Sequence, residues 1–211
     1  MTMAEMETTN AKAEDAVSGY KGAKLGMWFF LLTEILFFGV MFMLYSVNRS
    51  KYPHGFHIAA LEENLLIGSV NTIILITSSF TMALSISAIR KGNKILSSWL
   101  QLATIVMGCL FLINKYFEWS AKIHQGIYPD SPVLLQKEKG EALFYSLYYV
   151  MTGIHGLHVL VGIGVISTML FFTLKEKINS ESFVKLENTG LYWHFVDIVW
   201  IYLFPLFYLV T

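Results

Sequence analysis

A single carboxylate, Glu34, stands in the middle of a long apolar stretch near the beginning of the chain. It follows Lys24 by ten residues, which places it about 15 Å along a helix, near the centre of a bilayer. Ionisation is disfavoured where water is excluded, so we expect this carboxyl to stay neutral. It either takes part in proton transfer or lipid contact, or serves as a structural acid hydrogen-bonded to another helix.

Two pairs of polar side chains with i, i+3 spacing lie in later apolar stretches: His155 with His158, and His194 with Asp197. Residues three apart share one face of a helix, so these pairs could ligate haem or copper, or could form hydrogen bonds between helices. Haem ligation also needs facing histidines and an apolar slot, which spacing alone does not supply. The pattern therefore favours interhelical hydrogen bonds, and we predict no metal site.

One further apolar stretch, residues 65–89, combines the amide of Asn71 with many small hydroxyl side chains. These hydroxyl residues are Ser69, Thr72, Thr77, Ser78, Ser79, Thr81, Ser85 and Ser87. Such side chains commonly pack and hydrogen-bond between membrane helices. We therefore interpret this stretch as a packing helix, with a pore lining as the alternative.

These polar residues need long apolar helices to position them, and the sequence contains five stretches of sufficient length. The stretches run from Lys24 to Tyr45, Leu65 to Ile89, Ile95 to Trp119, Ala142 to Leu174 and Leu191 to Val210. Each has at least the ~20 residues that a helix needs to cross the hydrocarbon core, where backbone groups must be bonded within the segment. The predicted fold is all-α, an integral membrane bundle of five transmembrane helices.

The composition supports a membrane environment and excludes several soluble functions. Hydrophobic residues make up 55% of the chain and charged residues 14%, against roughly 25% charged in soluble domains. The 15 basic and 15 acidic residues balance, so the chain has no electrostatic footprint for nucleic acid. It has no phosphate-binding glycine loop and no recognisable Ser-His-Asp set. We predict no catalytic residue, and the lone Cys109 excludes an internal disulfide.

The chain is expected to divide into a mobile polar tail, residues 1–23, and one membrane domain, residues 24–211. Its orientation is predicted from the basic residues, which concentrate on the cytoplasmic side of membrane proteins. With the N-terminus inside, nine lie inside: Lys12, Lys21, Lys24, Arg90, Lys91, Lys94, Lys175, Lys177 and Lys185. Five lie outside: Arg49, Lys51, Lys122, Lys137 and Lys139. We therefore expect a cytoplasmic N-terminus and a periplasmic C-terminus.

Four motifs in order along the chain resemble the cytochrome c oxidase subunit III family of haem-copper oxidases. They are Trp-Phe-Phe-Leu-Leu-Thr-Glu-Ile-Leu-Phe-Phe at 28–38; Asn-Thr-Ile-Ile-Leu at 71–75; Tyr-Phe-Glu at 116–118 with Gly-Ile-Tyr at 126–128; and Thr-Gly-Ile-His-Gly-Leu-His-Val at 152–159 with Tyr-Trp-His-Phe-Val-Asp-Ile-Val-Trp at 192–200. The resemblance covers residues 24–211, so it extends over nearly the whole chain.

The resemblance implies an accessory subunit of a respiratory complex in the bacterial inner membrane. Such a subunit binds no haem or copper itself; the catalytic subunit I, accompanied by subunit II, holds those cofactors and reduces oxygen. The accessory subunit is expected to hold phospholipids and to support proton uptake. The complex is further expected to belong to a larger respiratory supercomplex. On this resemblance Glu34, His155 and His158 are buried groups linked to protons or lipid. Asn71, His194 and Asp197 belong to an interhelical polar motif.

The sequence also departs from the family pattern. The mitochondrial form has seven helices, so two N-terminal helices are absent here, and the segment 131–141 is longer than usual. Two alternatives stay open. One is the related subunit of a quinol oxidase or nitric oxide reductase complex. The other is an independent secondary transporter, although the chain shows none of the inverted repeats typical of that class.

Overall fold

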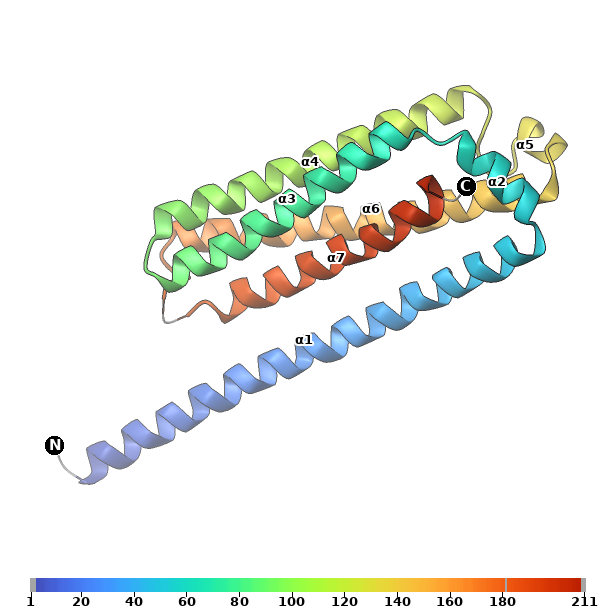
Figure 1. The fold of residues 1–211 in the computed structure, drawn as a ribbon. Helices are drawn as coiled ribbons and strands as arrows, with labels where there is room; N and C mark the ends of the chain where they lie inside the picture. The colour runs from blue at the N-terminus through green and yellow to red at the C-terminus, as the bar shows by residue number, and fades with distance from the viewer. Residues whose placement is uncertain (1–2, 181, 210–211) are drawn as a thin grey trace. The chain divides into compact units, whose positions relative to one another are not determined.

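The structure is a computed structural model that describes the backbone of residues 3–180 and 182–209 and the side chains from Tyr20 onward, except residue 181. Within these residues it contains seven helices and no strand (Figure 1). The helices are α1 (Met3–Lys51), α2 (Pro53–Leu61), α3 (Leu65–Arg90), α4 (Lys94–His124), α5 (Pro132–Gln136), α6 (Lys139–Leu174) and α7 (Val184–Tyr208). The chain forms two units, Met1–Phe37 and Phe38–Thr211.

The predicted all-α membrane fold is confirmed. By length and composition, five helices are able to cross a membrane: the segment Tyr20–Lys51 of α1, then α3, α4, α6 and α7. The last span begins at Val184 rather than at the predicted Leu191. The prediction was too late because the first turns of this helix carry polar residues, which lower its hydropathy. Its predicted end, Val210, lies outside the described residues.

Two short helices, α2 and α5, were not predicted. Pro53 and Pro132 each occupy the first position of one of them, where proline is favoured because its fixed φ suits a helix start. The predicted mobility of residues 1–23 stays a prediction, although the backbone from Met3 is helical and continuous with α1.

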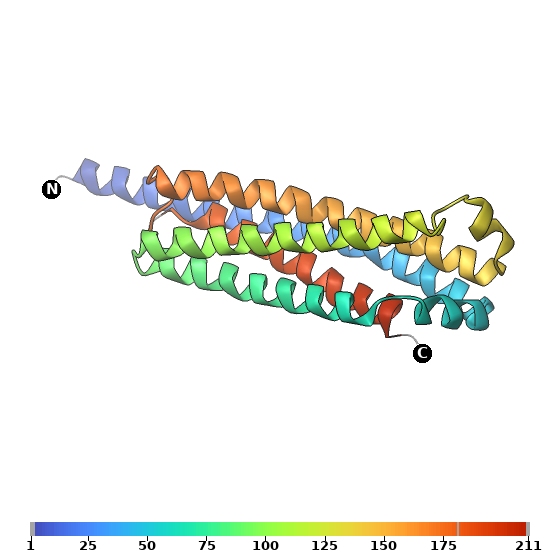
Figure 2. The same ribbon diagram turned by 90° about the horizontal axis from the view of Figure 1, so that it is seen from above.

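Within the second unit, four long helices form a ring: α3 contacts α4 and α7, and α6 contacts α4 and α7. Figure 2 shows α3 and α4 running antiparallel beside each other, joined by a tight turn. We name the end that carries α2 and α5 the loop end. The opposite end, with the connections Arg90–Lys94 and Lys175–Phe183, is the turn end.

The helices at the turn end stop at defined positions. Gly92 follows α3 with φ +77°, and the N–H groups of Gly92 and Asn93 bond back to the carbonyls of Ile89 and Ala88. This is the Schellman arrangement, in which glycine usually takes the left-handed position. The end of α6 has the same hydrogen bonds, but there Glu176 occupies that position with φ +59°.

Aromatic side chains fill the centre of the ring, and apolar side chains cover its outside. Trp193 is completely buried and lies between α4 and α6, because Gly108 and Gly162 leave room for its ring. A Cβ at either glycine would come within 2.9 Å or less of the indole. The outward faces expose residues such as Phe80, Phe117 and Leu157, as expected for helices surrounded by lipid. Cys109 on α4 is also exposed.

Candidate functional site: a polar interior in the helix ring

The most highly charged part of the interior lies at the loop end, on α4, α6 and α7. The Lys115 ammonium is 3.2 Å from the Glu118 carboxylate and donates hydrogen bonds to the hydroxyls of Tyr148 and Tyr208, at 2.9 and 3.0 Å. Both tyrosine hydroxyls donate in turn to one oxygen of Glu118, each at 2.5 Å. All four residues are buried.

This cluster satisfies its own hydrogen-bonding capacity. An ammonium group has three protons to donate, and Lys115 has three acceptors around it. A buried ion pair is tolerable only with such additional hydrogen bonds, because removing two charges from water is costly. The geometry therefore indicates a closed structural network that fixes α4, α6 and α7 against one another. It leaves no Lys115 donor available to bind a substrate.

A second ion pair joins the turn before α3 to the end of α4. Lys122 lies 2.9 Å from Glu63, and both side chains are buried. Burial raises the pKa of Glu63 to about 7, and the nearby Lys122 charge offsets only part of that effect. Burial therefore favours the neutral form of this carboxyl up to higher pH than for an exposed glutamate.

A more exposed set of charges surrounds it. Lys137, just after α5, contacts Glu62 at 2.8 Å and Glu141 at 2.7 Å, and Tyr145 donates to Glu62 at 2.6 Å. Burial alone would raise the pKa of Glu62, but hydrogen bonds from Lys137 and Tyr145 bring it below its ordinary value. The segment that follows α4 is thereby tied to α2 and α6.

Deeper in the ring, the sequence-predicted Asn71 bonds across helices. The amide of Asn114 on α4 donates to the Asn71 carbonyl oxygen at 2.9 Å, and Asn71 is completely buried. His155 on α6 is also completely buried, with ring contacts to Phe111 at 5.6 Å and Trp200 at 5.3 Å. Neither ring nitrogen of His155 has a hydrogen-bond partner among the described residues, so aromatic packing holds it.

A further predicted histidine, His158, lies on α6 three residues after His155. The Nδ1 atom of His158 is 2.9 Å from the Ile154 carbonyl of its own helix. The ring of Phe38 packs edge-on against His158 at 5.3 Å. The structure places His158 and His155 on one helix but in different surroundings, so it does not bring the pair together as one site.

His194 and Asp197 meet at a shared neighbour on α3. The hydroxyl of Ser79 is 2.6 Å from His194 Nδ1 and also lies beside the buried carboxyl of Asp197. One residue earlier on α3, Ser78 accepts a 3.0 Å hydrogen bond from the Trp193 indole. The hydroxyl-rich helix predicted from sequence thus presents consecutive serines to α7.

Glu34 lies on α1 in the first unit, Met1–Phe37. His155 and His158, which the family resemblance groups with it, lie in the second unit. The shared proton or lipid role of these three residues therefore stays a prediction.

Sequence reasoning did not single out the Lys115 network. Its signal was present: Lys115, Glu118 and Lys122 repeat at i, i+3 and i+7 within a span otherwise rich in apolar residues. Charges at helical spacing in a membrane segment are costly and therefore point to partners inside the protein. Tyr148 and Tyr208, which complete the network, carry no such signal because tyrosine is common in these helices.

The part of the chain that the structure describes contains no group of three or more His, Cys, Asp or Glu side chains able to hold a metal ion. The two lysines buried in the ring, Lys115 and Lys122, each pair with a neighbouring carboxylate. Together the five spans and this interior define a multi-pass helical membrane protein.

Comparison with known proteins gives the particular family. The family model described as cytochrome c oxidase subunit III matches residues 3–211, so the chain belongs to that family. A cytochrome c oxidase subunit 3 from Synechocystis is 37% identical over 87% of this chain and 74% of its own length. A quinol oxidase subunit 3 from Bacillus subtilis is 30% identical over 99% of this chain and 97% of its own.

A third relative is a much longer protein. It is named heme-copper oxidase subunit I+III and comes from Aeropyrum pernix. It is 30% identical over 87% of this chain, which spans 22% of that protein.

Proposed function

We propose that this chain is the accessory subunit III of a bacterial respiratory haem-copper oxidase and carries out no redox chemistry itself. It sits beside the catalytic subunits I and II, which hold haem and copper and reduce oxygen. It supports them through structural stability, bound phospholipid and proton uptake. The complex lies in the inner membrane, with the N-terminus of this chain in the cytoplasm and its C-terminus in the periplasm.

The family match over residues 3–211 is the observation that carries this proposal. The self-contained Lys115 network is consistent with it, because a closed set of charges stabilises helix packing without offering a reactive group. An independent transporter is the less favoured function, since none of the similar proteins above is named as one.

Affinity purification of the tagged chain from its native membrane tests the proposal. We expect a haem-containing complex that consumes oxygen, with an optical spectrum that identifies its haems. After separation, this subunit is expected to contain no stoichiometric iron, copper or zinc. Copper or iron bound to the isolated subunit, or activity of the chain alone as a carrier, would overturn the accessory role.

The electron donor separates two forms of the proposal. Relatives named for cytochrome c oxidase and for quinol oxidase both align over most of this chain, so the donor is either a cytochrome c or a quinol. Oxygen consumption by the purified complex, measured with reduced cytochrome c and then with a quinol, decides between them. A complex that instead reduces nitric oxide would place the chain in the related reductase.

Glu34 is the residue we assign to lipid contact or proton uptake. We expect Glu34→Ala to leave the complex assembled and its initial rate of oxygen reduction largely unchanged. The variant should lose activity faster during sustained turnover and retain less phospholipid at the first two spans, α1 and α3. A hydrophobic carbodiimide should label Glu34 preferentially, since it partitions into lipid and reacts with protonated carboxyls.

The matched control is Glu138→Ala, which removes an exposed carboxylate at the loop end. It should neither abolish labelling nor accelerate inactivation. If Glu34→Ala abolished the first turnover while assembly and haem content stayed normal, Glu34 would belong to the catalytic machinery.

A further inference from the structure

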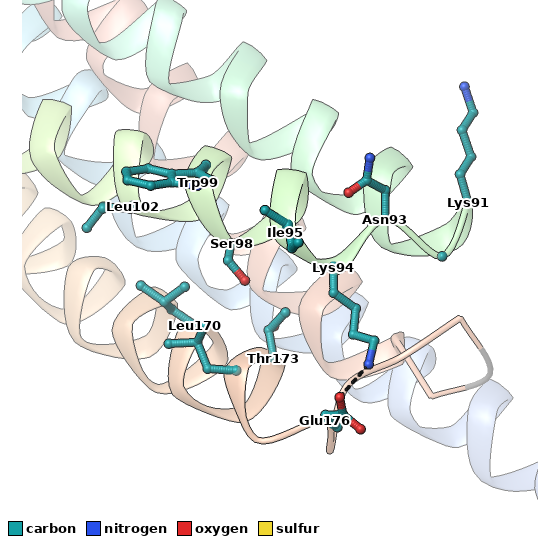
Figure 3. A pocket seen from close by; sticks show the side chains of 12 residues that line it. Lys91, Asn93, Lys94, Ile95, Ser98, Trp99, Leu102, Leu170, Thr173 and Glu176 are labelled. Atoms are coloured by element: carbon teal, nitrogen blue, oxygen red, sulfur yellow. Dashed lines mark hydrogen bonds and ion pairs between the residues drawn. The ribbon is translucent and has the colours of Figure 1, made fainter.

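A large groove lies at the turn end, away from the polar interior. It has a volume of about 860 Å³ and lies between the beginning of α4 and the end of α6. Figure 3 shows its two walls: Ile95, Trp99 and Leu102 come from α4, and Leu170 and Thr173 come from α6. Its volume falls within the range of small-molecule sites.

The groove is polar at its mouth and apolar below. Lys91, Asn93, Lys94 and Glu176 surround the mouth, where Lys94 and Glu176 form an ion pair of 2.7 Å across the opening (Figure 3). Below them the lining is mainly apolar as far as Leu102, eight residues after Lys94, or about 12 Å along the helix. This is the polarity profile of a phospholipid, from headgroup to upper acyl chain.

Charge identifies the kind of headgroup. By sequence, the two connections at the turn end and their flanks carry six basic residues and three acidic ones. The basic residues are Arg90, Lys91, Lys94, Lys175, Lys177 and Lys185, and the acidic ones are Glu176, Glu181 and Glu187. An excess of lysine beside a pocket between membrane helices favours anionic phosphate headgroups.

The depth of the groove argues against a helix as the occupant. A transmembrane helix spans ~30 Å of hydrocarbon and packs along that length. This groove reaches about 12 Å below Lys94. Trp99 is 66% exposed within the first turns of α4, and tryptophan at this level is typical of the lipid–water interface.

We propose that this groove binds one phospholipid with an anionic headgroup. Lys94 holds the phosphate; Lys91, whose side chain points away from Lys94 in Figure 3, adds positive charge near it, and the acyl chains run along Trp99, Leu102 and Leu170. Glu176 competes with the phosphate for Lys94, so it limits the affinity of the site. The site is separate from the lipid proposed at α1 and α3, and its existence does not depend on the orientation of the chain.

Native mass spectrometry of the intact complex in detergent tests the site with phosphatidylglycerol, and phosphatidylcholine serves as the neutral comparison. We expect Lys91→Gln combined with Lys94→Gln to weaken retention of phosphatidylglycerol about tenfold, with little effect on phosphatidylcholine. The control, Lys175→Gln combined with Lys177→Gln, removes two lysines from the same end but outside the groove lining and should retain the lipid. Unchanged retention in the first variant would overturn the proposal.

Two further measurements test the proposal: one variant that should increase lipid retention, and a crosslinking experiment that locates the acyl chain. Glu176→Gln should increase phosphatidylglycerol retention several-fold, because Lys94 loses its internal partner. A phosphatidylglycerol with a photoreactive acyl chain should crosslink to the peptides containing Leu102 and Leu170. Crosslinks confined to other helices, or to a second protein subunit seated in the groove, would show that lipid does not occupy it.

Discussion

The two ends of the helix ring handle charge in opposite ways. The loop end carries six basic residues, Arg49, Lys51, Lys115, Lys122, Lys137 and Lys139. It also carries six acidic residues, Glu62, Glu63, Glu118, Asp130, Glu138 and Glu141. Several of these form buried or half-buried ion pairs. The turn end has an excess of basic residues, and its pair between Lys94 and Glu176 is exposed.

This difference shows how burial changes the role of the same chemical groups. At the loop end, the buried charges of Glu63, Lys115, Glu118 and Lys122 are desolvated and paired, so each depends strongly on its partner. At the turn end, Arg90 pairs with the buried Glu187, but water screens the exposed Lys94–Glu176 pair, which contributes little to stability. Lys91, Lys94 and Glu176 are therefore accessible to a ligand or a membrane surface, whereas the buried loop-end groups hold helices together.

The first prediction concerns which end of the helix ring faces the periplasm, and a reporter fusion gives one of two opposite results. We predict that the loop end faces the periplasm, so the end of α7, which lies there, is outside (Figure 1). A C-terminal alkaline phosphatase fusion should be active, and a C-terminal reporter that works only in the cytoplasm should stay silent. The opposite pattern would invert the assignment of both ends.

The largest expected loss of stability comes from Glu118→Gln. The substitution keeps an acceptor for Tyr148 and Tyr208 but leaves the buried Lys115 charge without its counter-charge. Removing one partner of a buried pair typically costs about 3–5 kcal/mol. Equilibrium unfolding in mixed detergent micelles measures this change in the free energy of unfolding.

A double variant provides the control for that prediction. Glu118→Gln combined with Lys115→Gln removes both charges, so it should be more stable than Glu118→Gln alone. A single variant as stable as the wild type would show that the network does not hold the helices.

A smaller effect is expected from Glu63, whose pKa burial raises to about 7 from an ordinary value of 4.5. A raised pKa means that the folded protein holds this proton more tightly than the unfolded chain. Its stabilising contribution is complete below pH 4.5 and is lost as the pH rises through about 7. Stability should therefore fall by about 2 kcal/mol between pH 5 and pH 8, and Glu63→Gln should remove that slope.

The neighbouring Glu62 serves as the control for the pH experiment. Lys137 and Tyr145 lower the pKa of Glu62, so it stays ionised from pH 5 to pH 8. Glu62→Gln should leave the slope unchanged. Equal slopes in the wild type and Glu63→Gln would mean that another group causes the pH dependence.

The smallest effect is expected at the turn end, from Glu176→Gly. The change removes an exposed ion pair but also places glycine at the left-handed position with φ +59°, which glycine adopts without strain. The two effects oppose each other, so the unfolding midpoint should match that of the wild type within error. A loss as large as that of Glu118→Gln would remove the distinction between the two ends.

Most of the membrane spans could be predicted, because the hydropathy of a segment depends only on its own residues. Continuous apolar stretches specify membrane helices directly, and four of the five spans lie where the sequence placed them to within a few residues at one or both ends. The helix α7 was predicted to begin too late, because its first residues are polar but pack inside the ring. Glu187 and Thr189, for example, are buried.

The candidate site was only partly predictable. Asn71, His194 and Asp197 stood out as polar residues in apolar stretches. In the structure Asn71 and His194 bond across helices, and the functional role of all three stays a prediction. His155 gave the same signal, yet it packs between aromatic rings. A sequence identifies which side chains need a partner, but it does not give the partner.

The membrane environment, the number of spans, the family resemblance and the excess of basic charge on one side could all be inferred from the sequence alone. These properties depend on composition and order, which are local to each segment. Two features depend on the folded arrangement. Lys115 contacts Tyr148 and Tyr208, which are 33 and 93 positions away along the chain, and α4 and α6 leave a groove below Lys94. Those outcomes depend on which helix faces pack together, and many faces of these helices are apolar enough to pack.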